Sequence, residues 1–157
     1  QQIINIAKPL DFVSLLSIFS DNKYQYSVKA IEDSVTCDLG FEMVKNLAKE
    51  NGRFSSDLME KISKITDKII LQSLEIRRRN LKGRVAFILL YFSKEIYNNH
   101  IFELPISRKE IAEYINMSTE NVIRSLSEFR KDEIIKIFGK RIEINNPDSL
   151  ERISKFG

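Results

Sequence analysis

Two side chains near the C-terminus, Glu120 and Arg124, have charges and a spacing suited to chemistry with another molecule. On a helix, residues four apart lie on one face. A guanidinium can donate two hydrogen bonds to guanine O6 and N7, and a carboxylate can accept one from cytosine N4. The pair is therefore predicted to read base edges. The alternative is a surface ion pair between the two side chains, which would contribute little.

The residues before this pair predict the elements that would present it. Ser107 and Glu110 form a capping box at the start of a short helix. Asn116 and Met117 form a turn, because Asn tolerates the left-handed conformation. Ser118 then caps a second helix. The apolar residues expected to face inward are Ile111, Ala112, Ile115, Val122, Leu126 and Phe129. Two short helices joined by a tight turn predict a helix-turn-helix.

The second helix of such a motif presents its first turns to the major groove. The predicted base-reading residues are Thr119, Glu120, Ile123 and Arg124. Residues 134–137 and 141–144 flank Gly139 and predict a hairpin, or wing. The predicted phosphate-binding residues are Ser107, Arg108, Ser118, Lys140 and Arg141. Pro147 is expected to begin a terminal helix.

A long apolar seam precedes this motif. Its members, spaced by four and three residues in turn, are Leu58, Ile62, Ile65, Ile69, Gln72 and Ile76. This spacing predicts a helix from Ser55 or Ser56 whose seam meets a second chain. The alternative is a helix packed on its own domain. Gly83 is expected to break this pattern. The nearly continuous apolar residues 85–97 predict a buried helix. Residues 102–106 predict an extended linker.

Period-two patterns within residues 1–40 predict short half-buried strands. Cys37 is expected to be a buried strand residue rather than a redox switch. A helix is expected over residues 41–50, ended by Asn51 and Gly52. The chain begins with Gln1, and three or four strands are marginal alone, so we expect it to be a piece of a longer protein.

The bulk composition narrows the possible classes of protein. Residues 75–157 hold 16 basic and 12 acidic residues, a net charge of +4, so the positive excess of the chain, +3 overall, lies in this part. One Cys and one His, Cys37 and His100, supply no multi-Cys metal site and no visible nucleophile–base pair. We therefore expect neither an enzyme nor a bound cofactor. No apolar run approaches the roughly 18 residues of a membrane span, so membrane insertion is not expected. A single cysteine can form no disulfide within the chain, which fits the reducing cytoplasm where we expect the protein to act.

Three consecutive arginines, Arg77, Arg78 and Arg79, close the long helix. One interpretation is a solvated helix end whose cations complement the helix dipole. The alternative is direct contact with DNA. His100 lies in a polar loop, where a metal role is not expected.

The stretches Leu104–Ile115 and Met117–Phe129 resemble the Crp/Fnr family of transcription regulators. The resemblance extends at least from Phe12 to Ile144. It implies an α+β architecture: the end of a sensor β-roll (residues 1–54), a long dimerisation helix (55–82) and a winged helix-turn-helix (83–157). It also implies that Glu120 and Arg124 read bases, within a TGA core in some members. Asn116 stands where the family often has Gly, and Ile123 replaces the Ser of some members.

The resemblance also bears on ligands. Cyclic-nucleotide binders use a Glu and an Arg, where this chain has Leu15 and Tyr26, so cyclic AMP is not the expected effector. The iron–sulfur cluster of Fnr needs several cysteines, which only a preceding segment could supply. The expected partners are a double-stranded DNA operator, a second copy of the chain, RNA polymerase and an unknown small-molecule effector. The rival function is a ligand-sensing or protein-interaction module whose winged helix binds no DNA.

Overall fold

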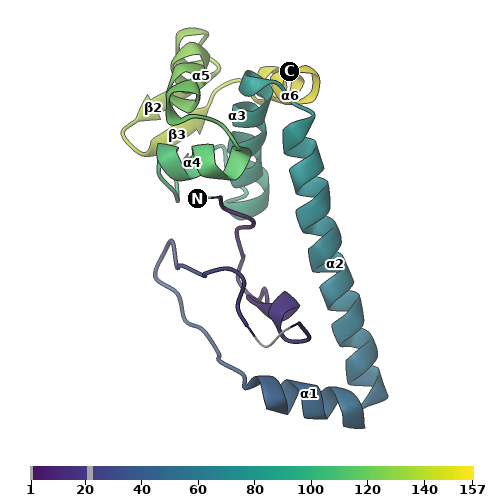
Figure 1. The fold of residues 1–157 in the computed structure, drawn as a ribbon. Coiled ribbons are helices and arrows are strands. Elements are labelled where there is room, and N and C mark those ends of the chain that lie inside the picture. Colours follow the sequence, from purple (N-terminus) through teal and green to yellow (C-terminus); the bar gives the residue numbers. More distant parts are fainter. Residues whose placement is uncertain (1, 21–22) are drawn as a thin grey trace. The chain divides into compact units, whose positions relative to one another are not determined.

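The computed structural model describes residues 2–20 and 23–157 (Figure 1). Its contacts divide the chain into two compact units. The larger comprises Gln72–Gly157 with the segment up to Ile6, and the smaller comprises Ala7–Leu71. The long helix α2, Gly52–Arg77, contributes residues to both units.

The smaller unit contains a 3-10 turn, η1 (Leu15–Ser17), the helix α1 (Phe41–Glu50) and most of α2. α1 has the predicted bounds, and Asn51 is its C-cap. The Asn51 side chain accepts a hydrogen bond from the Phe54 N–H, so α2 begins at Gly52, a few residues before the predicted start. The apolar core of this unit consists of Leu15, Ile18 and Val44, with Phe41, Phe54, Leu58, Ile62 and Ile65 packed against it.

The strands predicted within residues 1–40 do not form in residues 2–20 or 23–40, and that prediction is wrong. A strand needs a neighbour to pair with its backbone groups, and a period-two pattern predicts half-burial without supplying one. Val28, Val35 and Leu39 follow the pattern but are exposed. Cys37 is exposed as well, so its predicted burial is also wrong.

The larger unit is organised around α3 (Leu81–Leu90), which continues as a π-helical turn over Tyr91–Ile96. α3 packs against α4, α5 and α6, and Val85, Ile88 and Leu89 are fully buried in it. Figure 1 shows α3 beside these three helices.

Gly83 lies inside α3 and does not interrupt it, contrary to the sequence prediction. The Asn80 side chain caps the helix by accepting from the Gly83 N–H. A Cβ atom at Gly83 would lie 2.9 Å from the backbone of Gly157. The glycine therefore permits a close approach between α3 and the end of α6 rather than a break in the helix.

A three-stranded antiparallel sheet completes the larger unit, in the order β1 (Ile101–Glu103), β3 (Arg141–Ile144), β2 (Ile135–Phe138). β2 and β3 are the predicted hairpin, and Gly139 turns it with a φ of 64°. β1 replaces the first part of the predicted linker, because Phe102 pairs with Ile142 of β3 and is buried. This sheet confirms the α+β class.

The last helix, α6 (Pro147–Phe156), begins at Pro147 as predicted, with Asn146 as its cap. Leu150 of α6 is fully buried. The core that joins the helices and the sheet includes Phe92, Ile115, Val122, Phe129, Ile135 and Ile142. This core holds the two short helices that carry the candidate site.

Candidate nucleic-acid interface

The first of the two short helices, α4 (Arg108–Ile115), begins at the predicted capping box. The Ser107 hydroxyl accepts from the Glu110 N–H at 3.2 Å, and the Glu110 carboxylate accepts from the Ser107 N–H at 2.8 Å. Ile111, Ala112 and Ile115 are buried as predicted. The start of α4 is thus fixed by both partners of the box.

The turn after α4 is formed by Asn116, which has φ 53° and ψ 60°. The Met117 N–H donates to the carbonyl of Ala112, which closes the turn at 2.9 Å. Ser118 then caps α5 (Thr119–Lys131) by accepting from the Asn121 N–H. The predicted turn and both predicted N-caps are therefore confirmed.

α5 buries one face and exposes the other. Val122, Leu126 and Phe129 are at most 2% exposed, whereas Ile123 is 46% exposed. Of the other three predicted base-reading residues, Glu120 and Arg124 are exposed and Thr119 is half-buried. The structure thus brings all four to the outer side of the first two turns of α5.

Glu120 and Arg124 do not pair with each other among the ion pairs of the described residues. The pKa of Glu120 is lowered by hydrogen bonds from its own backbone N–H and from the Ser118 hydroxyl. The Arg124 guanidinium donates to the amide oxygen of Asn121 at 2.7 Å. Both head groups lie over the start of α5, and neither neutralises the charge of the other. Base reading needs this arrangement.

Asn121 is a residue that the sequence analysis did not select. It lies three residues before Arg124 and orients the guanidinium. The i,i+3 spacing of an amide and a guanidinium was the available signal.

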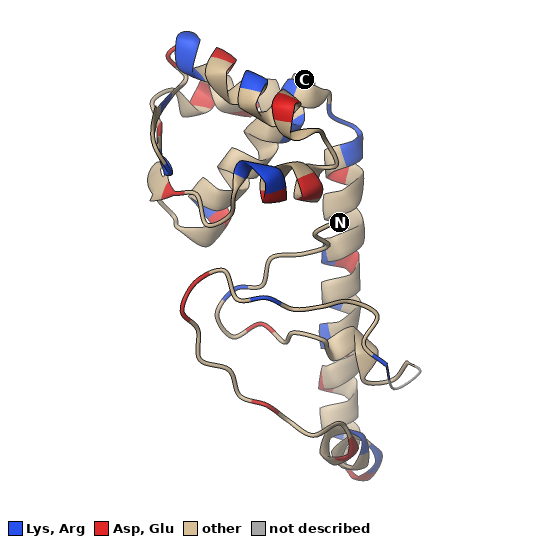
Figure 2. Ribbon diagram, turned by 60° about the vertical axis from the view of Figure 1, so that its left-hand side comes forward, with Lys and Arg blue, Asp and Glu red and all other residues tan. Residues whose placement is uncertain are grey.

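The predicted phosphate-binding residues lie at the start of α4, at the start of α5 and in the wing. Arg108 donates to the carbonyl of Gly139 at 3.4 Å, which links α4 to the wing turn. Lys140 and Arg141 are exposed in the wing. The hydroxyls of Ser107 and Ser118 already serve as helix caps. Figure 2 shows basic residues at the start of α4, along α5 and in the wing, with acidic residues among them.

The three arginines at the end of α2 do not share one environment. Arg79 is buried, donates to the carbonyl of Ser154, pairs with Glu75 and stacks on the Phe87 ring. Neither sequence interpretation, a solvated end or a DNA contact, holds for Arg79. The guanidinium instead joins α2 to α6 because the α6 carbonyl lies within its reach. Arg77 and Arg78 are exposed.

The six residues of the predicted dimer seam have different surroundings. Leu58, Ile62 and Ile65 pack on the core of the smaller unit. Gln72 accepts a hydrogen bond from the Tyr114 hydroxyl, Ile76 is buried in the larger unit, and Ile69 is half-buried. The apolar side chains that α2 leaves exposed are Met59, Ile70, Leu71 and Leu74. Five of the six seam residues, all but Ile69, therefore have partners within the chain. The exposed stripe beside them belongs to neither core cluster of the described residues.

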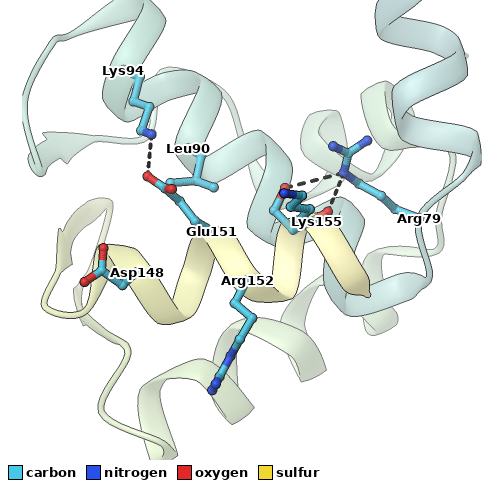
Figure 3. A pocket seen from close by; sticks show the side chains of 8 residues that line it. Arg79, Leu90, Lys94, Asp148, Glu151, Arg152 and Lys155 are labelled. Carbon is cyan, nitrogen blue, oxygen red and sulfur yellow. Dashed lines mark hydrogen bonds and ion pairs between the residues drawn. The ribbon is translucent and has the colours of Figure 1, made fainter.

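A cavity of about 400 Å³ lies beside α6 in the larger unit (Figure 3). Lys94 and Glu151 form an ion pair there, and this hydrogen bond lowers the pKa of Glu151. Ligand pockets are usually apolar with a few polar groups, whereas this lining is mostly charged. Its residues are Arg79, Leu90, Lys94, Asp148, Glu151, Arg152, Ser154 and Lys155.

The described residues contain no cluster of three or more potential metal ligands, and His100 lies beside Ser93. No described helix is both long and apolar enough to cross a bilayer.

A helix-turn-helix followed by a β-hairpin defines a winged helix-turn-helix protein. Comparison with known sequences agrees, since residues 83–153 match the Crp-like helix-turn-helix domain. Residues 83–153 thus carry a Crp-like helix-turn-helix domain, and the chain is similar to transcriptional regulators of the Crp/Fnr family.

Two relatives illustrate the similarity. The transcriptional activator protein Anr of Pseudomonas protegens is 25% identical over 96% of this chain. The fumarate and nitrate reduction regulatory protein of Escherichia coli is 24% identical over 98%. The chain spans 63% of the length of each relative.

Solved structures show the same fold at low identity. FixK2 from Bradyrhizobium japonicum has a TM-score of 0.65 and 22% identity, covering 72% of this chain and 58% of its own. A putative transcriptional regulator of the Crp/Fnr family from Eubacterium rectale has a TM-score of 0.63 and 21% identity, covering 73% and 52%.

Proposed function

We propose that this chain regulates transcription by binding a palindromic DNA operator as a homodimer. α5 enters the major groove, where Arg124 reads a guanine and Glu120 the neighbouring cytosine, with Thr119 and Ile123 adjusting the preference. The observation that carries the proposal is the separation of Glu120 and Arg124 on an exposed α5 face. Each head group is available to a base edge without first breaking an ion pair with the other.

The phosphate contacts follow from the positions of the basic groups. Arg108, at the start of α4, bonds to the wing turn, and Lys140 and Arg141 extend from the wing itself. Ser107 and Ser118 lie at helix N-termini, where backbone N–H groups favour anions. These five residues would fix the register of α5 on the duplex rather than read its sequence.

Dimer formation through α2 is part of the same proposal. Ile69 of the predicted seam lies beside Ile70, and Leu74 follows one turn later. Ile70 and Leu74 are each more than half exposed, and a stripe of this kind on a helix is usually covered by a partner. A second copy of α2 would cover the stripe while Leu58, Ile62 and Ile65 keep their contacts within the chain.

The finer partners also belong to this proposal: RNA polymerase, an unidentified small-molecule effector, and a cytoplasmic location where DNA is accessible. The proposal includes that cyclic AMP is not the effector. Leu15 is buried among apolar side chains, and Tyr26 accepts a hydrogen bond from the Ser17 hydroxyl. Neither offers the cation or carboxylate that a cyclic phosphate and a ribose need.

The test is selection of bound duplexes from a random pool, followed by affinity measurements over a range of salt concentrations. We expect an inverted repeat whose half-site centres lie about one helical turn, ~10 base pairs, apart. Affinity should fall steeply as salt rises. Recovery of no preferred sequence would contradict the proposal. Salt-insensitive binding to a protein would favour the interaction-module alternative instead.

A further inference from the structure

Arg84, near the start of α3, bonds to two helix ends at once. Its Nε donates to the carbonyl of Arg79 at 3.0 Å, and its Nη2 donates to the carbonyl of Arg77 at 3.5 Å. Its Nη1 donates to the carbonyls of Asn116, at 3.0 Å, and Ile115, at 3.4 Å. The Arg77 carbonyl is the last of α2, and the Arg79 carbonyl lies in the link between α2 and α3. The Ile115 carbonyl is the last of α4, and Asn116 is the C-cap of that helix.

The carbonyls at a helix C-terminus lack intrahelical partners and carry the negative end of the helix dipole. Two such ends brought together would repel each other and leave acceptors unpaired. A guanidinium has five N–H donors in a rigid planar fork, so one Arg84 side chain can serve both ends. This geometry explains how α2 and α4 can end so near one another.

The place where Arg84 meets α4 is the turn of the helix-turn-helix. Asn116 has the left-handed backbone there, and α5 begins three residues later at Thr119. Two other side-chain hydrogen bonds join the C-terminal end of α2 and the residues after it to α4 and α6. Tyr114 donates to Gln72, and Arg79 donates to Ser154 of α6. Arg84 reaches the turn that directs the recognition helix.

We propose that Arg84 is a positioning residue that sets the angle between the end of α2 and the recognition helix α5, and so the operator spacing that a dimer accepts. This rests on the proposed function for its DNA consequence. In a dimer built on α2, the position of α2 sets the twofold axis, and the position of α5 sets which bases are contacted. Each added base pair turns one half-site by about 35° around the duplex axis. A fixed angle between α2 and α5 therefore selects one spacing.

The first test needs no DNA. Spin labels are placed on exposed positions at the end of α2 and on α5, with Arg78→Cys and Ser127→Cys in a Cys37→Ser background. The labelled chain is mixed with excess unlabelled chain so that distances within one chain are measured. We expect Arg84→Gln to broaden or shift the distance distribution and Arg84→Lys to restore it in part, because an ammonium can bond to fewer of the carbonyls.

Arg77→Gln is the matched control. It removes a cation from the same helix end but keeps the Arg77 carbonyl, so its distances should match the unmutated chain. An unchanged distribution in Arg84→Gln would overturn the proposal.

The second test measures affinity for operators whose half-sites are one base pair closer or farther apart. The unmutated chain and Arg77→Gln should share one preferred spacing. In Arg84→Gln the discrimination between spacings should fall by about 2- to 30-fold, the usual range for a residue that couples two elements. An equal loss at every spacing would overturn the proposal, since it would show only a general weakening. If the unmutated chain binds no operator, the proposed function fails, and the spin-label distances still decide the role of Arg84.

Discussion

Arg124 and Arg108 carry the same charge but lie in different positions with respect to the proposed duplex. Arg124 extends from the exposed face of α5 and is oriented by Asn121. Arg108 bonds to the wing turn, where it would meet the phosphate backbone. A base reader and a phosphate binder should respond differently to substitution, and that difference can be measured.

Arg124→Ala should cost roughly 1–3 kcal/mol of operator binding and flatten the preference at one G·C pair, because a bidentate contact is lost. Arg108→Ala should weaken binding to all sequences about equally and lower the salt slope by about one ion. Affinities for single-base operator variants, measured at several salt concentrations, provide both readouts. An unchanged ranking of operator variants in Arg124→Ala would rule out base reading by this residue.

Glu120 should be ionised at neutral pH, since hydrogen bonds to its charged form lower its pKa. Its carboxylate can therefore accept from cytosine without a change of protonation.

Asn116 is the residue whose backbone the turn constrains most. Its positive φ suits Asn and Gly but not a β-branched side chain. Asn116→Val should lower the free energy of unfolding by about 1–2 kcal/mol, whereas Asn116→Gly should leave it near that of the unmutated chain. Chemical denaturation of the two variants checks this. Equal stability of the two variants would show that the turn does not hold this conformation in solution.

At the scale of elements, α3 and α5 are joined by an ion pair between Lys82 and Glu128 at 2.7 Å. The hydrogen bond between them raises the pKa of Lys82 above its usual 10.5 and lowers the pKa of Glu128 below its usual 4.5. Because the pKa of Glu128 is lower in the folded chain than in the unfolded chain, the pair stabilises the fold above the pKa of the unfolded chain. This stabilisation is lost as pH falls through the pKa of Glu128 in the folded chain. Because the pKa of Lys82 is raised, its stabilisation is present below the Lys pKa of the unfolded chain and is lost as pH rises through the Lys82 pKa of the folded chain.

Lys82→Gln should therefore lower the melting temperature slightly between about pH 5 and pH 10, since the pair is exposed. The difference from the unmutated chain should vanish in strong acid, where Glu128 is protonated. Thermal melts across this pH range measure it. A difference that persisted at acid pH would mean that Lys82 acts through packing rather than charge.

The exposed apolar stripe of α2 leads to a prediction about dimer formation. Ile70→Asp combined with Leu74→Asp should give monomers and abolish tight operator binding, because two charges would face the partner helix. Ile65→Asp is the contrasting variant. Ile65 packs on the core of the smaller unit, so this change should lower stability instead. Sedimentation and thermal melts separate the two effects. A monomeric unmutated chain at micromolar concentration would refute dimerisation through α2.

At the scale of the whole molecule, the proposed function includes a small-molecule effector other than cyclic AMP. Calorimetric titration of cyclic AMP should show no binding at physiological nucleotide levels, because Leu15 and Tyr26 supply neither charge that the nucleotide needs. Micromolar affinity accompanied by tighter operator binding would refute this. Titration of the chain with Leu15→Glu and Tyr26→Arg, the residues of nucleotide binders, is the matched comparison.

Local signals in the sequence were enough to predict the C-terminal motif. The capping box of Ser107, the Asn116 turn and the wing glycine each act over a few residues, so the sequence around them determines the structure. Interactions between distant residues were not visible in the same way. Arg79 could not be placed without knowing that Ser154 of α6 lies beside it. The strands expected before residue 41 failed for the same reason, since a strand depends on a distant neighbour.

The π-helical turn after α3 has one more consequence. The Tyr97 N–H bonds five residues back to Phe92, so this turn holds one residue more than an α-helix would. Deleting a single residue from Tyr91–Ile96 would let this turn close with α-helical hydrogen bonds and leave the direction of the following chain nearly unchanged. A deletion within α3 itself would instead rotate everything beyond it by about 100°. Phe102 would then leave its place opposite Ile142, and β1 would lose its register. The π-helical turn is therefore the place in this helix where the length of the chain can change by one residue at the lowest cost to the fold.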